Sequence, residues 1–254
     1  MTANRDTAAW LPPPAELALG PDDVHVWRVS LVQARADVAA LADVLRDDER
    51  ARAARFVFDR DRDAFTVARG SLRILLGRYL DRPPRDIELG YRDKGKPYLL
   101  TPPGEPVRFN VSHSGEIALL AFARGREIGV DVERSRPMSD LLAVGRLSFS
   151  PPEYAALCGL PERDHQAAFF ACWSRKEAFI KATGEGVSQL NDFEVSLLPG
   201  EPARIVRIGG AVPAQPRWTM RELPAIVGYA VALVVEGPRF ELSCLDGSPH
   251  LGVR

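Results

Sequence analysis

The segment IGVDVE, residues 128–133, ends in alternating apolar and acidic side chains, a pattern typical of a β-strand with one buried face. Because side chains along a strand point alternately to its two faces, the apolar residues can enter a core while Asp131 and Glu133 share the opposite face. The rise of a strand puts these two positions about 6–7 Å apart along the backbone. That spacing suits two oxygen ligands of one hard cation such as Mg²⁺. Taken alone, the segment is more simply interpreted as an exposed strand face that is acidic.

A second informative segment, CWSRKEAFIK, covers residues 172–181 and lies within a predicted helix over residues 165–183. Trp173, Glu177 and Lys181 are spaced by four residues, so they follow one side of that helix. A Glu–Lys pair at this spacing is also a common surface salt bridge. The functional alternative has Glu177 binding or lying beside a metal and Lys181 reaching a phosphate one turn along.

Two shorter polar segments precede these. Residues 110–114, NVSHS, follow a strand predicted from residue 107, and residues 95–97 are Gly-Lys-Pro. Each is most simply a turn, although serine hydroxyls, an imidazole and turn N–H groups together can hold a phosphate. No G-x-S-x-G, Walker A or G-x-G-x-x-G motif stands out. The sequence therefore favours phosphate chemistry that uses a carboxylate-held metal and basic side chains instead of a P-loop.

Around these segments, hydrophobic periodicity predicts a mixture of helices and strands without a strict βαβ rhythm. Helices are predicted over residues 35–57, 61–80 and 165–183, with a further helix beginning at Ser150. Gly184 is predicted to cap the last of them. Strands are predicted over residues 24–31, 87–91, 107–111, 117–123, 128–133, 193–197, 203–208, 217–223 and 228–235. This order of elements indicates an α+β fold.

Composition limits the classes of partner. The chain has 254 residues, 46% of them apolar, and its 33 Lys and Arg nearly balance its 34 Asp and Glu. Charge balance gives no general argument for nucleic acid or membrane binding, and we expect neither. No signal peptide or bilayer-spanning run is apparent. The three cysteines lack zinc-site spacing, which favours a reducing, cytoplasmic location.

Taken together and in order, these motifs resemble those of the 4′-phosphopantetheinyl transferase superfamily, in particular its larger, single-chain, surfactin-synthetase-activating type. The resemblance covers roughly residues 50–195. The matching segments are GKP at 95–97, FNVSHS at 109–114, IGVDVE at 128–133, SPPEY at 150–154, WSRKE at 173–177 with Lys181, and ATGEG at 182–186.

The resemblance implies a pseudo-dimer of two similar α/β subdomains in one chain, with coenzyme A bound in the cleft between them. The join is expected near residues 124–127. The N-terminal subdomain, residues 1–124, would then supply CoA nucleotide contacts, and the C-terminal subdomain, residues 125–254, the metal and catalytic motifs.

By the same resemblance, Asp131, Glu133 and Glu177 would hold Mg²⁺, or Mn²⁺, which oxygen ligands alone do not distinguish. Glu177, Lys181 and Asp131 would be the catalytic residues, with Glu177 as the candidate base. The expected CoA contacts are Lys96, Pro97, Ser112, His113, Lys176, Lys181, Arg69 and Arg55.

The implied reaction moves the 4′-phosphopantetheine arm of CoA to a serine of an apo acyl or peptidyl carrier protein and releases adenosine 3′,5′-bisphosphate. A role in secondary metabolism and a monomeric state are expected. The alternatives are a convergent Mg²⁺-dependent phosphotransferase, a non-catalytic CoA- or carrier-binding homologue, and a purely structural protein. The non-catalytic homologue would be expected to lack one of the acidic residues or Lys181, and all of them are present.

Overall fold

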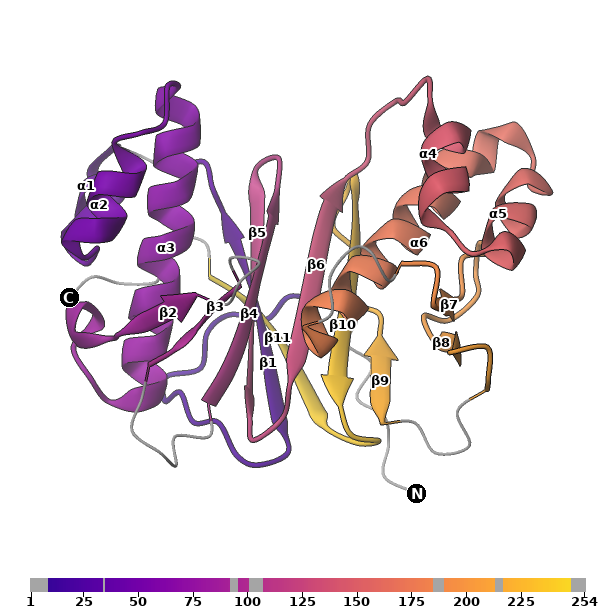
Figure 1. The fold of residues 1–254 in the computed structure, drawn as a ribbon. Helices are drawn as coiled ribbons and strands as arrows, with labels where there is room; N and C mark the ends of the chain where they lie inside the picture. Colours follow the sequence, from indigo (N-terminus) through magenta and orange to yellow (C-terminus); the bar gives the residue numbers. More distant parts are fainter. Residues whose placement is uncertain are drawn as a thin grey trace.

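The computed structural model describes residues 9–33, 35–91, 96–100, 107–184, 190–212 and 217–247 (Figure 1). The elements, in chain order, are β1 (Asp23–Ser30), α1 (Arg35–Asp43), α2 (Asp47–Ala53), α3 (Asp59–Leu80), the 3₁₀ turn η1 (Pro84–Asp86), β2 (Leu89–Tyr91), β3 (Pro97–Leu99), β4 (Val107–Ser114), β5 (Ile117–Arg124), β6 (Ile128–Arg134), α4 (Leu141–Ser148), α5 (Pro151–Cys158), α6 (Glu162–Thr183), β7 (Phe193–Val195), β8 (Ile205–Ile208), β9 (Trp218–Arg221), β10 (Tyr229–Glu236) and β11 (Glu241–Asp246).

The first half of the chain packs the long helix α3 against a four-stranded sheet of order β11-β1-β5-β4. Helix α3 is buried on all sides over residues 66–77, and its C-terminus is closed by Asp81 in the left-handed region, whose N–H bonds to the Gly77 carbonyl. The helix predicted over residues 35–57 is instead two helices, α1 and α2. The break has a local cause, because the Glu49 carboxylate accepts a 3.0 Å hydrogen bond from the Arg46 N–H and starts a new helix there.

The second half packs α6 against an antiparallel three-stranded sheet of order β6-β10-β9. Helix α5 begins at Ser150 as predicted, with a capping box in which Ser150 and Glu153 bond to each other's backbone N–H. Gly184 ends α6 in the left-handed conformation, also as predicted. Helix α4 and the strands β3 and β11 were not predicted.

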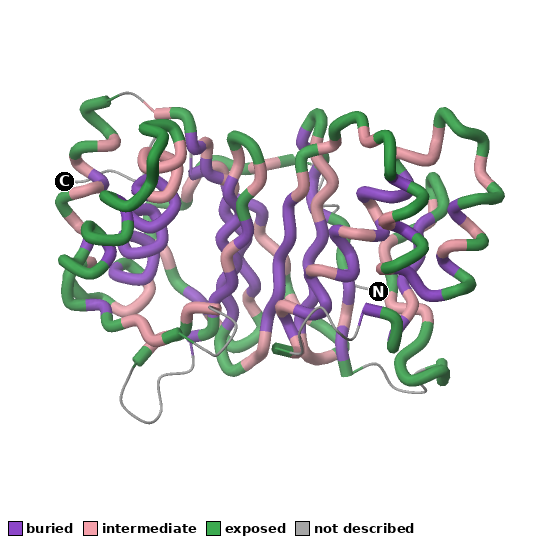
Figure 2. Tube along the Cα trace, turned by 45° about the horizontal axis from the view of Figure 1, so that its top comes forward, coloured by how far each residue is buried: buried purple, intermediate pink, exposed green. Residues whose placement is uncertain are grey.

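The two sheets lie in the middle of the molecule, with α3 outside one and α6 outside the other (Figure 1). Alternate residues of each strand face the outer helix, and the remaining ones form a third core between the sheets. Figure 2 shows the buried residues concentrated along these central strands. The shared core includes Val24, Val26, Leu119, Ala121, Val130, Val132, Leu233 and Val235.

The molecule is therefore a mixed α+β structure with two domains, as predicted, and each half contributes one 22-residue helix, α3 or α6. The last strand, β11, returns to the first half and pairs in parallel with β1. The division of the chain at residues 124 and 125 falls close to the β5–β6 turn and stays a prediction. No helix in the described part of the chain is long and apolar enough to cross a membrane.

Candidate active site

Asp131 is the centre of the polar cluster between the two halves. Its carboxylate is 1% exposed. One oxygen, Oδ1, accepts 2.8 Å and 2.6 Å hydrogen bonds from the Ser112 hydroxyl and the Lys181 ammonium. The other, Oδ2, is buried without a hydrogen-bond partner among the described residues. A buried carboxylate oxygen without a partner is costly, so this atom is suited to accept a cation.

Helix α6 brings its functional side to this carboxylate. Trp173, Glu177 and Lys181 are partly exposed along one stripe, whereas residues between them are buried. Gly129 allows the approach, because a Cβ built there would lie 2.1 Å from the Ala178 carbonyl oxygen. The predicted helical spacing of the three residues and their place opposite the acidic face of β6 are therefore both present in the structure.

Glu133 and Glu177 share the electrostatic environment of Asp131. Desolvation raises the pKa of both carboxyls, and the Asp131 charge raises each of them further. The Lys181 ammonium acts in the opposite direction on both pKa values. Three mutually repelling carboxylates form a set of hard oxygen donors that a divalent cation would neutralise.

In this conformation, however, no three His, Cys, Asp or Glu side chains of the described residues are grouped closely enough to hold a metal ion. Lys181 is the cation that pairs with Asp131 here, at 2.6 Å. The donor chemistry and the unpartnered Asp131 oxygen fit Mg²⁺, and the Lys181 ammonium balances only one of the three carboxylate charges.

The predicted NVSHS turn is in fact part of β4, which pairs with β5 through Ser114 and Ile117 before Gly115 turns the chain. Asn110, Ser112 and Ser114 therefore point to one side of the strand and His113 to the other. His113 reaches solvent, but neighbouring protein atoms remove part of its hydration and lower its pKa.

The charges of Lys181 and Arg52 lower the His113 pKa further. The charges of Lys181 on α6 and Arg52 on α2 therefore both act on the imidazole of His113 on β4. Sequence reasoning selected the neighbouring Arg55, which is exposed in the turn after α2, and missed Arg52. Helical spacing alone could not identify Arg52, because the imidazole on which its charge acts lies on a distant strand.

Lys96 joins the first half to the end of α6. Its ammonium donates to the Lys181 carbonyl oxygen, lies 3.5 Å from the Ile128 carbonyl oxygen and pairs with Glu127 at 3.9 Å. Pro97 begins β3 next to it. Lys96 therefore helps to cap the C-terminus of α6 beside Asp131. Gly95 of the same motif lies outside the described residues.

Lys176 is not part of this cluster, which corrects the predicted phosphate contact. It is fully buried, and its ammonium donates to both Glu153 oxygens at 2.9 and 2.7 Å and to the Phe193 carbonyl oxygen at 2.7 Å. These three acceptors use the three N–H donors of the ammonium. Lys176 therefore stabilises the core of the second half and has no donor left for a phosphate.

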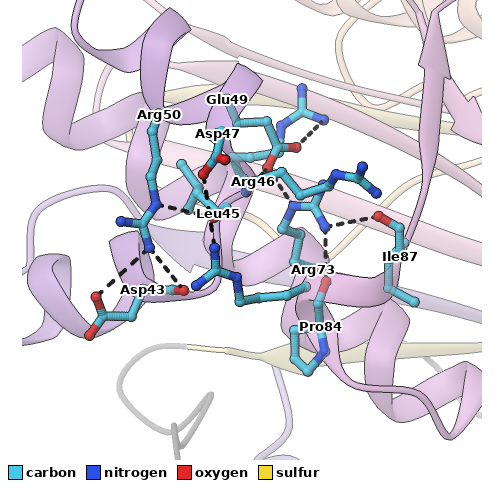
Figure 3. Close-up of polar contacts among 11 residues, drawn as sticks. Asp43, Leu45, Arg46, Asp47, Glu49, Arg50, Arg73, Pro84 and Ile87 are labelled. Carbon is cyan, nitrogen blue, oxygen red and sulfur yellow. Dashed lines mark hydrogen bonds and ion pairs between the residues drawn. The ribbon is translucent and has the colours of Figure 1, made fainter.

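Arg69 is 9% exposed and is committed to a different buried cluster. Its guanidinium lies 3.5 Å from Glu49 and over the rings of Phe65 and Tyr91. Figure 3 shows the same Glu49 bonded to Arg73, which also donates to the backbone of η1 and the following residue. This cluster fixes α2 to α3. A 3′-phosphate contact by Arg69 or by Arg55 stays a prediction.

Comparison with known proteins identifies the family. Residues 127–234 match the model of the 4′-phosphopantetheinyl transferase superfamily, and residues 31–124 match that of the 4′-phosphopantetheinyl transferase N-terminal region. The chain is 41% identical over 229 residues to the 4′-phosphopantetheinyl transferase HetI of Nostoc sp. (strain PCC 7120). The aligned region covers 90% of this chain and 94% of HetI.

Two further relatives have similar names. The 4′-phosphopantetheinyl transferase Sfp of Bacillus subtilis (strain 168) is 31% identical over 151 residues, covering 59% of this chain and 65% of Sfp. The L-aminoadipate-semialdehyde dehydrogenase-phosphopantetheinyl transferase of Pongo abelii is 27% identical over 234 residues, covering 86% of this chain and 74% of that protein. Because the HetI match spans nearly all of both proteins and the two family matches cover the two halves of the fold, this chain belongs to the 4′-phosphopantetheinyl transferase superfamily.

Proposed function

We propose that this chain transfers the 4′-phosphopantetheine arm of CoA to a serine hydroxyl of an apo acyl or peptidyl carrier protein. The observation that carries the proposal is the unpartnered Asp131 Oδ2, buried beside Glu133, Glu177 and Lys181. A phosphotransferase site needs such oxygen donors next to fixed positive charge. The names of the relatives support the group transferred.

Asp131, Glu133 and Glu177 are the residues that would hold Mg²⁺, and Mn²⁺ fits the same oxygen donors. When bound, the ion supplies positive charge that polarises the CoA pyrophosphate and neutralises the leaving group. The Asp131 charge raises the pKa of Glu133 and Glu177, and the Glu133 charge raises that of Glu177 further, which supports a shared cation.

Basic groups around the carboxylates would bind the phosphates. Lys181, which pairs with Asp131, would add fixed positive charge beside the CoA pyrophosphate. His113, whose pKa is lowered, is neutral at pH 7 and offers an imidazole N–H as a hydrogen-bond donor. Arg52 adds charge from the first half. A phosphate bound here would be contacted from both halves.

The chemical step needs one proton acceptor. The carrier serine oxygen bonds to the β-phosphorus of CoA, and the bond from that phosphorus to the bridging pyrophosphate oxygen breaks, releasing adenosine 3′,5′-bisphosphate. Glu177 would take the serine proton, directly or through water, because it is the partly exposed carboxylate on the helix that also presents Lys181.

The test measures the intact mass of a purified apo carrier protein after incubation with CoA, Mg²⁺ and this enzyme. We expect a gain of one phosphopantetheine group, about 340 Da from its composition, which EDTA and the substitution Asp131→Ala abolish. Glu241→Gln, at an exposed position on β11, serves as the charge-matched control.

One result would contradict the proposed transfer, and another would contradict only the assignment of its base. If several acyl and peptidyl carriers gain no mass while CoA still binds, the chain is the non-catalytic CoA-binding homologue. If Glu177→Gln retains near-normal turnover with the metal bound, the assignment of Glu177 as the base is wrong.

A further inference from the structure

The two sheets are joined along β4 and β6 by side chains instead of a backbone ladder. The side-chain oxygens of Asn110, Ser112 and Ser114 accept hydrogen bonds from the backbone N–H groups of residues 130, 132 and 134. The donor–acceptor distances are 2.9, 3.3 and 3.1 Å. The partners stay in parallel register, with a constant offset of 20 residues. We refer to these three contacts as the side-chain ladder.

The ladder follows from the alternation of both strands. Residues 110, 112 and 114 share one side of β4, and the N–H groups of residues 130, 132 and 134 are on the side of β6 away from its partner β10. An edge strand leaves such N–H groups unpaired, and burying them without acceptors is costly. Small polar side chains on β4 supply the acceptors and fix β6 against the first half.

Two members of the ladder also reach the candidate metal ligands. The Ser112 hydroxyl donates to Asp131 at 2.8 Å, and the Ser114 hydroxyl donates to Glu133 Oε2 at 2.9 Å. Each hydroxyl thus ties a backbone N–H and the carboxylate of the preceding residue together. Asn110 differs. Its side-chain oxygen accepts a hydrogen bond from the Val130 N–H, and the residue before Val130 is a glycine, which has no carboxylate.

We propose that Ser114 is a positioning residue that fixes Glu133 for divalent-cation binding. The inference rests on the proposed function, in which Glu133 is a metal ligand. Glu133 is only half-buried and is repelled by the Asp131 charge, while the Trp173 side chain and the Lys181 charge act with Ser114 to hold its carboxylate. Loss of the Ser114 hydroxyl would leave Oε2 without its bond to β4 and allow the carboxylate to turn away from Asp131. The Ser114 hydroxyl donates to Glu133 Oε2 and accepts a hydrogen bond from the N–H of the next residue, Arg134. It therefore fixes both the carboxylate and the backbone of β6.

Losing an outer hydrogen bond of this kind typically weakens metal affinity by 10- to 100-fold. The experiment measures Mn²⁺ binding to the full chain by electron paramagnetic resonance, with CoA present and no carrier. We expect Ser114→Ala to raise the dissociation constant for Mn²⁺ by about tenfold, and Ser114→Thr, which keeps the hydroxyl, to restore most of the affinity.

Asn110→Ala is the matched control, because it removes a ladder bond without touching a carboxylate. We expect its Mn²⁺ affinity to stay within about twofold of the wild-type value, since metal-ligand positioning is unchanged. Thermal unfolding of each variant separates a loss of folding from a loss of metal affinity.

Three results would overturn the inference: wild-type affinity in Ser114→Ala, an equal loss in Asn110→Ala, or no Mn²⁺ binding by the wild-type protein. Carrier modification is scored separately. A wild-type protein that binds Mn²⁺ but modifies no carrier, with affinity still lost in Ser114→Ala, would refute the proposed function and leave the role of Ser114 supported.

Discussion

Ser112 donates a 2.8 Å hydrogen bond to Asp131, although the two residues lie on strands of different sheets. The same hydroxyl accepts the Lys181 ammonium at 2.9 Å and the Val132 N–H at 3.3 Å. A serine hydroxyl has one donor and two acceptor positions, so Ser112 is fully bonded. The expected phosphate contact of its side chain would require one of these bonds to break. Its role in this conformation is to hold a carboxylate and a lysine together.

We predict that Ser112→Ala lowers kcat more than it raises KM for CoA. The substitution removes a hydrogen bond from both Asp131 and Lys181 without removing a charge. We expect a loss in kcat of at least tenfold, because tenfold corresponds to about 1.4 kcal/mol and a hydrogen bond to a charged group contributes about 1.5–3 kcal/mol. Steady-state kinetics with an apo carrier checks the split. A rise in KM with unchanged kcat would instead favour a ground-state phosphate contact by the hydroxyl.

Lys176→Ala is expected to destabilise the protein strongly, by about 3–5 kcal/mol, because it leaves Glu153 buried without its counter-charge. Chemical denaturation followed by circular dichroism measures the loss. The double substitution Glu153→Gln with Lys176→Met should recover part of it, since no charge then remains buried. If a folded Lys176→Ala protein bound CoA much more weakly at unchanged stability, the phosphate contact would be reinstated.

Gly129→Ala is expected to separate α6 from β6. A Cβ there would lie 2.1 Å from the Ala178 carbonyl oxygen and 2.4 Å from the Ala182 backbone nitrogen, and backbone atoms cannot turn aside. Overpacking of this kind costs about 1–3 kcal/mol or more, and the shift would also move Glu177 and Lys181 away from Asp131. Both the melting temperature and carrier modification should fall. Gly159→Ala, where the nearest atom would be 3.4 Å away, is the control and should leave both nearly unchanged.

Tyr79→Phe is expected to destabilise the first half by about 1–3 kcal/mol. The Tyr79 hydroxyl accepts the Trp27 indole N–H at 2.9 Å and lies 2.8 Å from His25 Nδ1. Its loss leaves the buried indole N–H without an acceptor. Thermal unfolding checks this, and Tyr98→Phe, at an exposed tyrosine on β3, is the matched control. Equal stability of the two variants would contradict the assigned bonds.

His25 should make unfolding sensitive to pH. Burial lowers its pKa, partly offset by the Asp23 charge, while in the unfolded chain it titrates near 6.5. Below about 6.5 the unfolded chain therefore binds more protons than the folded one, so the free energy of unfolding contributed by His25 falls as pH decreases toward the folded-state pKa. Comparing denaturation curves of the wild type and His25→Phe between pH 7.5 and 5.5 isolates this contribution, because the carboxylates are common to both. If the free energy of unfolding falls with decreasing pH equally in the wild type and in His25→Phe, the proposed contribution of His25 is wrong.

Local patterns in the sequence determined much of this protein. The spacing of Trp173, Glu177 and Lys181 fixed which residues share a side of α6, and the alternation in residues 128–133 fixed the face of Asp131 and Glu133. The capping box at Ser150 and the end of α6 at Gly184 were also readable. Each of these depends only on neighbours within about one turn of helix or two residues of strand.

The tertiary structure alone decided which face meets which partner. Lys176 and Lys181 lie on one helix, yet one is buried against Glu153 and the other contacts Asp131. The ladder between Ser114 and β6 and the return of β11 to the first sheet likewise join residues far apart in the chain. Periodicity specifies the residues that share a face, but the partner of that face depends on long-range packing, in which distant segments bury apolar surface and satisfy one another's polar groups.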